Sequence, residues 1–471
     1  MEGCGEFSFR AGLTGELVLA HDLRMAGRSL RRNPYLSALM IGALAVGITA
    51  SMIAITLYHA RAGHPMPWKE STLYAVTLDL RDDDPDQGFS RHPEYPPDQV
   101  SYMDAIALYG SDIPLRSVMM FRGVQVVTPE RHDVKPFGIG ARVTTADFFG
   151  AFDTPFLYGG GWTRTDDDAP SAVVVLSKHM NDKLFGGANS VGRNVVLDGR
   201  TYRVTGVIGA WMPRPKFYDL NSGSFDLPED IYLPFGWMKA LKMSTGGSIN
   251  CLSQRTQVGS FETILVSDCV WLQFWVEFKH AADRDRYQIF VNNYTDDQRS
   301  HGRFPRKNNN RLLTVPAWLD MNDVVGDESR IQVILGLVFL GVCILNTLGL
   351  MLAKFLGAAP IAGLRRALGA SRMDIIRQHL IEVVVVGLLG GLVGLLLTLV
   401  GLKVLKVWLF SEWVVGSDNP DQFALVNSLV HMDLSVILIC IGLSLLTGIL
   451  AGLYPAIRIG RLAPATFLKT Q

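Results

Sequence analysis

Apolar positions gather in four long runs along the chain. The runs comprise residues 35–58, 331–353, 380–402 and 434–456, and their only acidic or basic side chain is Glu382, near the start of the third. About 20 helical residues cross a bilayer core of about 30 Å, and uncharged runs of this length favour a membrane span over a buried soluble helix. We therefore predict four transmembrane helices.

Basic residues beside these runs predict their orientation, because Lys and Arg are enriched on the cytoplasmic side. Segments 1–34, 354–379 and 457–471 are expected inside, which leaves 59–330 and 403–433 outside. The arrangement is one span, a large outer domain, then three spans. The basic flanking residues are Arg24, Arg28, Arg31, Arg32, Lys354, Arg365, Arg366, Arg372, Arg377, Arg458, Arg461 and Lys469.

The outer segment 59–330 shows a mixed α/β pattern between glycine and proline turns. Asp198 and Gly199 are typical of a tight hairpin turn, and the spacing of Tyr287 and Phe290 predicts one face of an amphipathic helix. The expected strands are 171–176, 195–197, 201–208 and 270–278, and the expected helix is 281–294.

Composition agrees with a membrane protein. Hydrophobic residues make up 48% of the chain, and charged residues make up 19%, against a usual value of about 25%. Lys plus Arg equals Asp plus Glu at 44 each, so no global charge excess points to nucleic acid. Of the five cysteines, Cys251 and Cys269 fall in the outer segment. A disulfide between them and two unpaired thiols are both open, because sequence alone does not give connectivity.

The chain carries no recognisable catalytic or metal-binding motif. Residues 187–194 have the glycine spacing of a phosphate-binding P-loop, but Arg193 and Asn194 replace its Lys and Ser/Thr, and a strand follows instead of a helix. The acidic triplets 82–84 and 166–168 are interpreted as solvated turns. We therefore predict no catalytic residues, no metal site and no ATP hydrolysis by this chain alone.

Small residues in the third and fourth runs predict close helix packing. They are spaced as G-x-x-x-G pairs, which allow helix backbones to approach in lipid. A seam between subunits and packing within one chain are both consistent with this spacing. The glycines are Gly387, Gly390, Gly391, Gly394, Gly448 and Gly452.

The segment 363–382 carries the most specific pattern. It is basic, and its apolar stripe is broken by Gly369-Ala370-Ser371, which predicts a short helix, a tight turn and a membrane helix. Such a unit is a rigid lever for a cytosolic partner, or an amphipathic helix on anionic lipid. The stripe consists of Leu364, Leu368, Ile375, Ile376 and Leu380.

This segment resembles the FtsX-like permease subunits of MacB-type ABC transporters, whose loop reads Gly-Ile/Leu-Arg-Arg-Ala-Leu-Gly-Ala. Residues 454–458 are similar to the C-terminal signature of that family, and 143–209 to its periplasmic core domain. Residues 22–34 resemble its cytoplasmic N-terminal amphipathic helix. One departure is Pro360-Ile361-Ala362, where the family usually has an acid two positions before Gly363; it leaves open whether an ATPase contact is lost.

The resemblance implies a permease that passes the work of a separate ATPase to its outer domain and so drives export or efflux. ATP and magnesium would be bound by that ATPase, with no cofactor in this chain. The residues implied in the ATPase contact are Arg365, Arg366, Leu368, Gly369, Ala370 and Ser371, with Asp374 and Glu382 orienting the lever.

Further partners follow from the same resemblance. They are a second permease subunit, identical or different, and a periplasmic adaptor with an outer-membrane channel. The expected location is the bacterial inner membrane. Two alternatives stay open: an FtsX-like regulator of an envelope hydrolase or sensor that transports nothing, and a lipoprotein-releasing permease.

Overall fold

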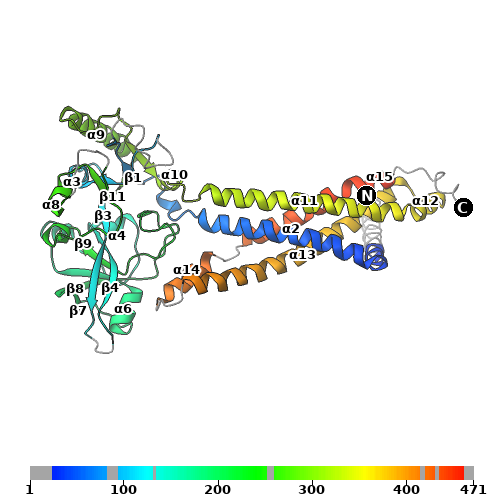
Figure 1. Ribbon diagram of the computed structural model, residues 1–471, viewed down its shortest axis with the longest axis horizontal. Helices are drawn as coiled ribbons and strands as arrows, with labels where there is room; N and C mark the ends of the chain where they lie inside the picture. The colour runs from blue at the N-terminus through cyan, green and yellow to red at the C-terminus, as the bar shows by residue number, and fades with distance from the viewer. Residues whose placement is uncertain are drawn as a thin grey trace, which may run out of the picture. The chain divides into compact units, whose positions relative to one another are not determined.

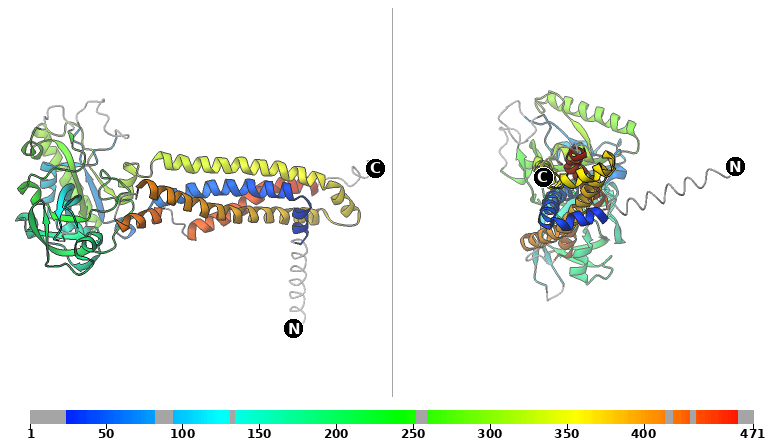
Figure 2. Two further views of the ribbon diagram at one scale, coloured as in Figure 1. Left: turned by 60° about the horizontal axis from the view of Figure 1, so that its bottom comes forward. Right: turned by 90° about the vertical axis from the view of Figure 1, so that its right-hand side faces the viewer.

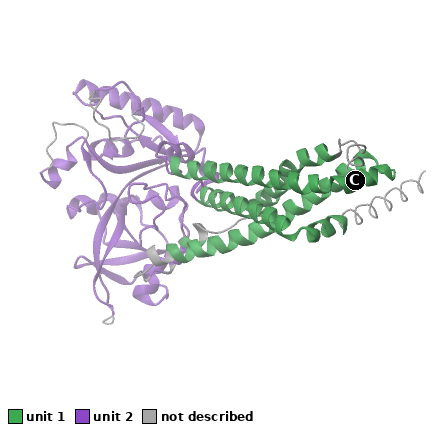
Figure 3. Cartoon of the chain, turned by 45° about the vertical axis from the view of Figure 1, so that its right-hand side comes forward, with its two compact units in different colours: residues 1–60, 326–416, 426–471 green, residues 61–325, 417–425 purple. Residues whose placement is uncertain are grey.

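The computed structural model describes residues 24–81, 94–130, 134–251, 259–413, 419–429 and 434–460 of the chain. It divides the chain into two compact units, which Figure 3 distinguishes by colour. The helical unit comprises residues 1–60, 326–416 and 426–471, and the outer unit comprises 61–325 and 417–425.

Four long helices form the helical unit and lie side by side in both Figure 1 and Figure 2. Each contains one predicted apolar run, so the four predicted spans are confirmed as helices long and apolar enough to cross a membrane. Residues 24–32 are also helical. The long helices are α2 (Pro34–Arg61), α11 (Asp327–Gly357), α13 (Arg372–Trp413) and α15 (Leu434–Gly460), and the shorter α12 (Ala359–Ala367) follows α11. Helix α14 (Pro420–Leu429) begins in residues of the outer unit and ends in residues of the helical unit.

The predicted glycine pairs pack helices of the same chain together. A Cβ atom at Gly391 would lie 2.3 Å from Ser444 Cβ, and one at Gly452 would lie 2.1 Å from Val383 Cγ2, so α13 and α15 approach closely along this face. On another face of α13, Cβ atoms at Gly390 and Gly394 would crowd α2, at 2.9 Å from Leu44 Cβ and 3.1 Å from Ala45 O. Packing within one chain therefore accounts for this spacing.

The outer unit is built on a mixed sheet in the described part of the chain. Its main path runs β12-β1-β11-β3-β4-β9-β6-β8-β5. The strands are β1 (Leu73–Thr77), β2 (Val100–Ser101), β3 (Arg116–Thr128), β4 (Phe137–Thr144), β5 (Phe156–Gly159), β6 (Val173–Ser177), β7 (Asn194–Leu197), β8 (Arg200–Ile208), β9 (Ile231–Pro234), β10 (Asn250–Cys251), β11 (Cys269–Glu277) and β12 (Arg311–Thr314).

Helices cover both faces of this sheet. Alternate residues of β3 and β11 enter two separate apolar cores: Met119 and Phe274 join one, and Val118 and Trp275 join the other. A strand buried on both faces reads as a nearly continuous apolar run. The helices are α3 (Tyr102–Tyr109), α4 (Asp147–Ala151), α5 (Arg164–Asp168), α6 (Lys178–Phe185), α7 (Trp237–Ala240), α8 (Phe261–Leu265), α9 (Ala281–Ser300) and α10 (Val315–Met321).

The predicted hairpin is confirmed. Leu197 pairs with Arg200, so Asp198 and Gly199 form the two-residue loop. Both loop residues have positive φ, 46° and 77°, as a hairpin turn that matches the strand twist requires. The predicted helix at 281–294 is α9, which continues to Ser300.

Cys251 and Cys269 are joined by a disulfide, directly opposite each other in the pairing of β10 with β11. The bridge ties a two-residue strand to the start of a fully buried one. Among the other described cysteines, Cys343 and Cys440 are free thiols buried in the helical unit.

A buried ion cluster fixes the loop between β8 and β9. Arg142 on β4 is fully buried and pairs with Asp219 and Glu229, and Lys216 Nζ lies 3.0 Å from Glu229 Oε1. Burial by itself would raise the pKa of Glu229, but the charges of Arg142 and Lys216 outweigh it and hold that pKa well below its usual range. Sequence patterns did not reveal this cluster, because Arg142 is distant in the chain from the acids that it pairs with.

Candidate functional site

The hairpin from the end of α11 to the start of α13 holds the predicted lever. Helix α11 ends at Gly357 and α12 starts at Ala359, with Ala358 capping both. Pro360 explains the break: it lacks an N–H, and its ring would clash with the carbonyl four residues earlier, whereas a proline is tolerated in the first turn of a new helix. Pro360 therefore lies in the first turn of α12.

Gly369 makes the turn that ends α12. Its φ is +104°, and the N–H groups of Gly369 and Ala370 donate to the carbonyls of Arg366 and Arg365 at 3.1 and 3.0 Å. This is the Schellman pattern, which usually needs glycine at the left-handed position. No atom lies within 4 Å of the place where a Cβ at Gly369 would sit, so the backbone conformation, and not crowding, demands glycine in this chain.

Ser371 and Asp374 cap the start of α13 reciprocally. Asp374 N–H donates to Ser371 Oγ at 3.2 Å, and Ser371 N–H donates to Asp374 Oδ2 at 3.1 Å. The pattern is a capping box, which satisfies backbone donors that the first helical turn leaves unpaired. Asp374 thus sets the local geometry of the turn.

The turn divides the predicted apolar stripe into two parts. Leu364 and Leu368 are 56% and 79% exposed, whereas Ile375 is 3% exposed. Met373, beside the turn, is 70% exposed. The tip of the hairpin therefore presents apolar side chains that the rest of the described chain leaves uncovered.

Arg365 braces the hairpin. Its Nη1 donates to Gln378 Oε1 at 2.7 Å, which links α12 to the first part of α13 across the turn. The side chain was expected to reach a partner, and here it contacts its own chain. Glu382 lies further along α13, away from the tip, where it pairs with Lys354 at the end of α11. Sequence patterns did not reveal this pairing: Lys354 directly follows the second predicted span, and Glu382 lies near the start of the third.

The P-loop-like stretch is a turn that leads into a strand. Gly187 and Gly192 both have positive φ, and β7 starts at Asn194, so no helix N-terminus follows. Arg193 lies over the ring of Phe185, 4.3 Å from its centroid. The strand that follows the turn matches the predicted context.

The acidic triplet 166–168 differs from its interpretation as a solvated turn. Asp167 is 8% exposed and accepts hydrogen bonds from Ala146 N at 2.7 Å and Trp162 Nε1 at 2.9 Å. Burial raises the pKa of Asp167 to about 6 against these hydrogen bonds. The triplet 82–84 lies outside the described residues. In the part of the chain that the structure describes, no three His, Cys, Asp or Glu side chains gather as metal ligands.

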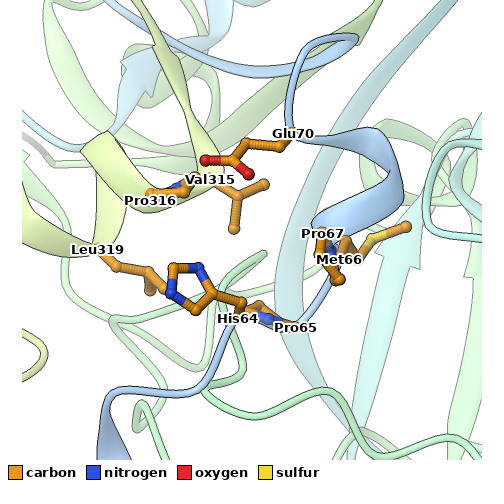
Figure 4. Close-up of a pocket in the computed structure, with 8 residues that line it drawn as sticks. All are labelled: His64, Pro65, Met66, Pro67, Glu70, Val315, Pro316 and Leu319. Carbon is orange, nitrogen blue, oxygen red and sulfur yellow. The ribbon is translucent and has the colours of Figure 1, made fainter. Parts of the chain in front are cut away.

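A small hollow in the outer unit is lined mainly by apolar groups. Figure 4 shows its side chains converging from two segments, residues 64–70 and 315–319. His64 and Glu70 are its only lining residues with ionisable side chains. The lining has no cluster of donors for a phosphate and no set of metal ligands, so the hairpin is the stronger candidate.

Comparison with known families matches both parts of this architecture. Residues 37–288, more than half of the chain, match the MacB-like periplasmic core domain, and residues 333–464 match the FtsX-like permease C-terminal region. The second match includes the whole hairpin. The chain therefore belongs to the ABC transporter permeases that combine these two regions.

Several relatives resemble the chain over most of its length. The macrolide export ATP-binding/permease protein MacB of Wolinella succinogenes is 24% identical over 466 residues, which cover 97% of this chain and 61% of that protein. The pyoverdine export ATP-binding/permease protein PvdT of Pseudomonas aeruginosa is 24% identical over 387 residues, 82% of this chain and 50% of that protein. The chain thus spans about half to three fifths of the length of these relatives.

A solved structure also resembles part of the chain. The crystal structure of the periplasmic region of MacB from Actinobacillus actinomycetemcomitans covers 53% of this chain and 92% of its own, with 14% identity and a TM-score of 0.34.

Proposed function

We propose that the chain is the membrane subunit of an export system and that its hairpin couples a separate ABC ATPase to the outer unit. The exposed apolar tip at Leu364, Leu368 and Met373 carries this proposal, because it lies on a turn that is capped from both sides. Exposed apolar side chains on a rigid turn can pack into a hydrophobic cleft of a partner protein. The names of the relatives, which combine ATP-binding and permease, support an ATPase as that partner.

The same proposal includes the orientation in the membrane. The hairpin carries Arg365, Arg366, Arg372 and Arg377 against a single acid, Asp374. An excess of Arg and Lys marks the cytoplasmic side, where ATP and an ATPase are found. The outer unit then lies beyond the bacterial inner membrane, where an adaptor and an outer-membrane channel would meet it.

A second permease subunit is the other partner that we propose. Helix α11 is the least covered span, with 22% of its most apolar window buried against 39% in each of the other three. Its open face carries Asn346, which is exposed and makes no hydrogen bond through its side chain to any described residue. An amide in hydrocarbon gains from a polar partner on a neighbouring helix, so a second permease chain against α11 would satisfy it.

ATP hydrolysis tests the proposal directly. The purified chain in nanodiscs should not hydrolyse ATP, and it should change the turnover of the ATPase that co-purifies with it. The control is the same complex with an ATPase whose nucleotide site is inactivated. Hydrolysis of ATP by the purified chain alone would contradict the proposal. Turnover by the complex that is unchanged when the nucleotide site of the ATPase is inactivated would contradict it as well.

A further inference from the structure

A buried ion pair closes the base of the hairpin. Lys354 Nζ at the end of α11 lies 2.6 Å from Glu382 Oε1 on α13, and each side chain is only 4% exposed. The whole of α12 and the Gly369 turn lie between these two residues in the sequence. The pair therefore fixes where the two arms of the hairpin join the spans.

Further polar side chains converge on this pair. Ser29 Oγ donates to Glu382 Oε1 at 2.6 Å, and Lys354 Nζ donates to Ser37 Oγ at 3.4 Å. His379 Nδ1 lies 3.5 Å from Glu382 Oε2. The helix at residues 24–32, α2, α11 and α13 are thus tied together at one point.

Stability alone is a poor explanation for such a cluster. Removing two charges from water costs about as much as their attraction returns, and apolar residues of similar size often serve a fold equally well. A paired charge in a poorly solvated site does impose one geometry, because separating the partners leaves each of them unpaired. Lys354 and Glu382 therefore resist any motion that spreads α11 from α13.

We propose that Lys354 and Glu382 are positioning residues that clamp the hairpin to the spans, so that a displacement of the tip moves α11 and α13 together. This inference rests on the proposed function, in which an ATPase displaces the tip. Without the clamp, the same displacement would be absorbed at the hairpin base by separation of the two helices. Binding of the ATPase depends on the tip and needs no clamp.

The test uses the complex of the chain and its co-purifying ATPase in nanodiscs. The main variant is Lys354→Met with Glu382→Leu, which removes both charges and leaves neither unpaired. The matched control is Lys403→Met, a lysine that is exposed on the same helix α13. The readouts are ATP turnover and the difference in amide hydrogen exchange of the outer unit between the ATP-vanadate and ADP states.

The clamp predicts that the double variant still binds the ATPase and turns over ATP, while the nucleotide-dependent exchange difference in the outer unit falls by about fivefold or more, the usual lower size of a coupling effect. The charge-swapped variant Lys354→Glu with Glu382→Lys should restore part of that difference. A purely structural role would instead raise exchange equally in both nucleotide states and keep the difference.

Two results separate the clamp from the proposed function. A double variant that keeps the full exchange difference would overturn the clamp and leave the proposed function standing. A wild-type chain that binds no ATPase would overturn the proposed function, and the clamp with it.

Discussion

Gly387 of α13 and Gly448 of α15 bring their helix backbones into direct contact: a Cβ atom at Gly387 would lie 2.8 Å from Gly448 Cα, and one at Gly448 would lie 3.1 Å from Gly387 Cα. Without side chains at this point, the two helices can approach closely and gain dispersion contacts along their length. The relationship makes the last two spans one packed pair.

Gly387→Ala should therefore destabilise the helical unit. The added methyl group meets backbone that cannot move aside, and overpacking of this kind typically costs about 1–3 kcal/mol. Thermal unfolding of the full chain in detergent measures the effect. Gly442→Ala on α15 is the matched control, because no atom lies within 4 Å of its Cβ position. Equal melting temperatures for the two variants would contradict this packing.

The turn at Gly369 should be sensitive to substitution for a conformational reason. Gly369→Ala forces a side chain into the left-handed region, at a cost of about 1–2 kcal/mol, and should weaken stimulation of the ATPase. Gly363→Ala is the control, since Gly363 lies within α12 without a positive φ and in open space. Gly369→Trp should abolish coupling while membrane insertion persists.

Stimulation of the ATPase by each variant, at equal membrane yield, is the measurement. Equal stimulation by Gly369→Ala and Gly363→Ala would show that the left-handed turn is dispensable for coupling.

The ion cluster around Arg142 predicts a pH-dependent stability. The folded-state pKa of Glu229 lies below its ordinary value of 4.5, because the attraction of Arg142 and Lys216 exceeds the effect of burial. Its ionised form therefore stabilises the fold above pH 4.5, and this contribution is lost as the pH falls through the lowered pKa. Glu229→Gln should remove about 3 kcal/mol at neutral pH, since it leaves Arg142 and Lys216 buried with one charge fewer beside them.

Tryptophan fluorescence during denaturant unfolding of the full chain, at neutral and acidic pH, measures both effects. A Glu229→Gln chain with the stability of the wild type at neutral pH would disprove this role of the cluster.

The membrane orientation can be tested by cysteine labelling in intact cells. Arg200→Cys in the outer unit should react with an impermeant thiol reagent, and Leu368→Cys at the hairpin tip should react only after the cells are opened. Both positions are exposed within their own units, so a difference in reactivity reports the side of the membrane. Reaction at position 368 in intact cells would invert the topology.

Much of the architecture could be predicted because its signals are local. The four uncharged runs, the Asp198-Gly199 turn and the alternation in β8 each follow from neighbouring residues. The contacts of Glu382 with Lys354 and Ser29, and the cluster of Arg142 with Asp219 and Glu229, join residues far apart in the chain. No periodicity encodes such pairs, and the same charges would suit many folds, so only the three-dimensional structure brings them together.

The roles within the hairpin show a similar limit. The sequence predicted a turn at Gly369-Ala370-Ser371, and the family resemblance implied these residues in a contact with the ATPase. The structure adds a different reason for Gly369, its positive φ, and assigns Ser371 and Asp374 to a helix cap. Arg365 bonds to Gln378, which charge patterns alone could not distinguish from a contact with another protein.

Association of the ATPase with the hairpin tip tests the central claim most directly. Leu368→Asp places a charge on the most exposed apolar side chain of the tip, and Leu115→Asp makes the same change at a residue of the outer unit that is 48% exposed. We predict that Leu368→Asp weakens co-purification of the ATPase by about tenfold or more, as loss of an interface anchor does, and that Leu115→Asp leaves it unchanged. Wild-type recovery of the ATPase with Leu368→Asp, at equal membrane yield, would contradict the assignment of this hairpin as the coupling site.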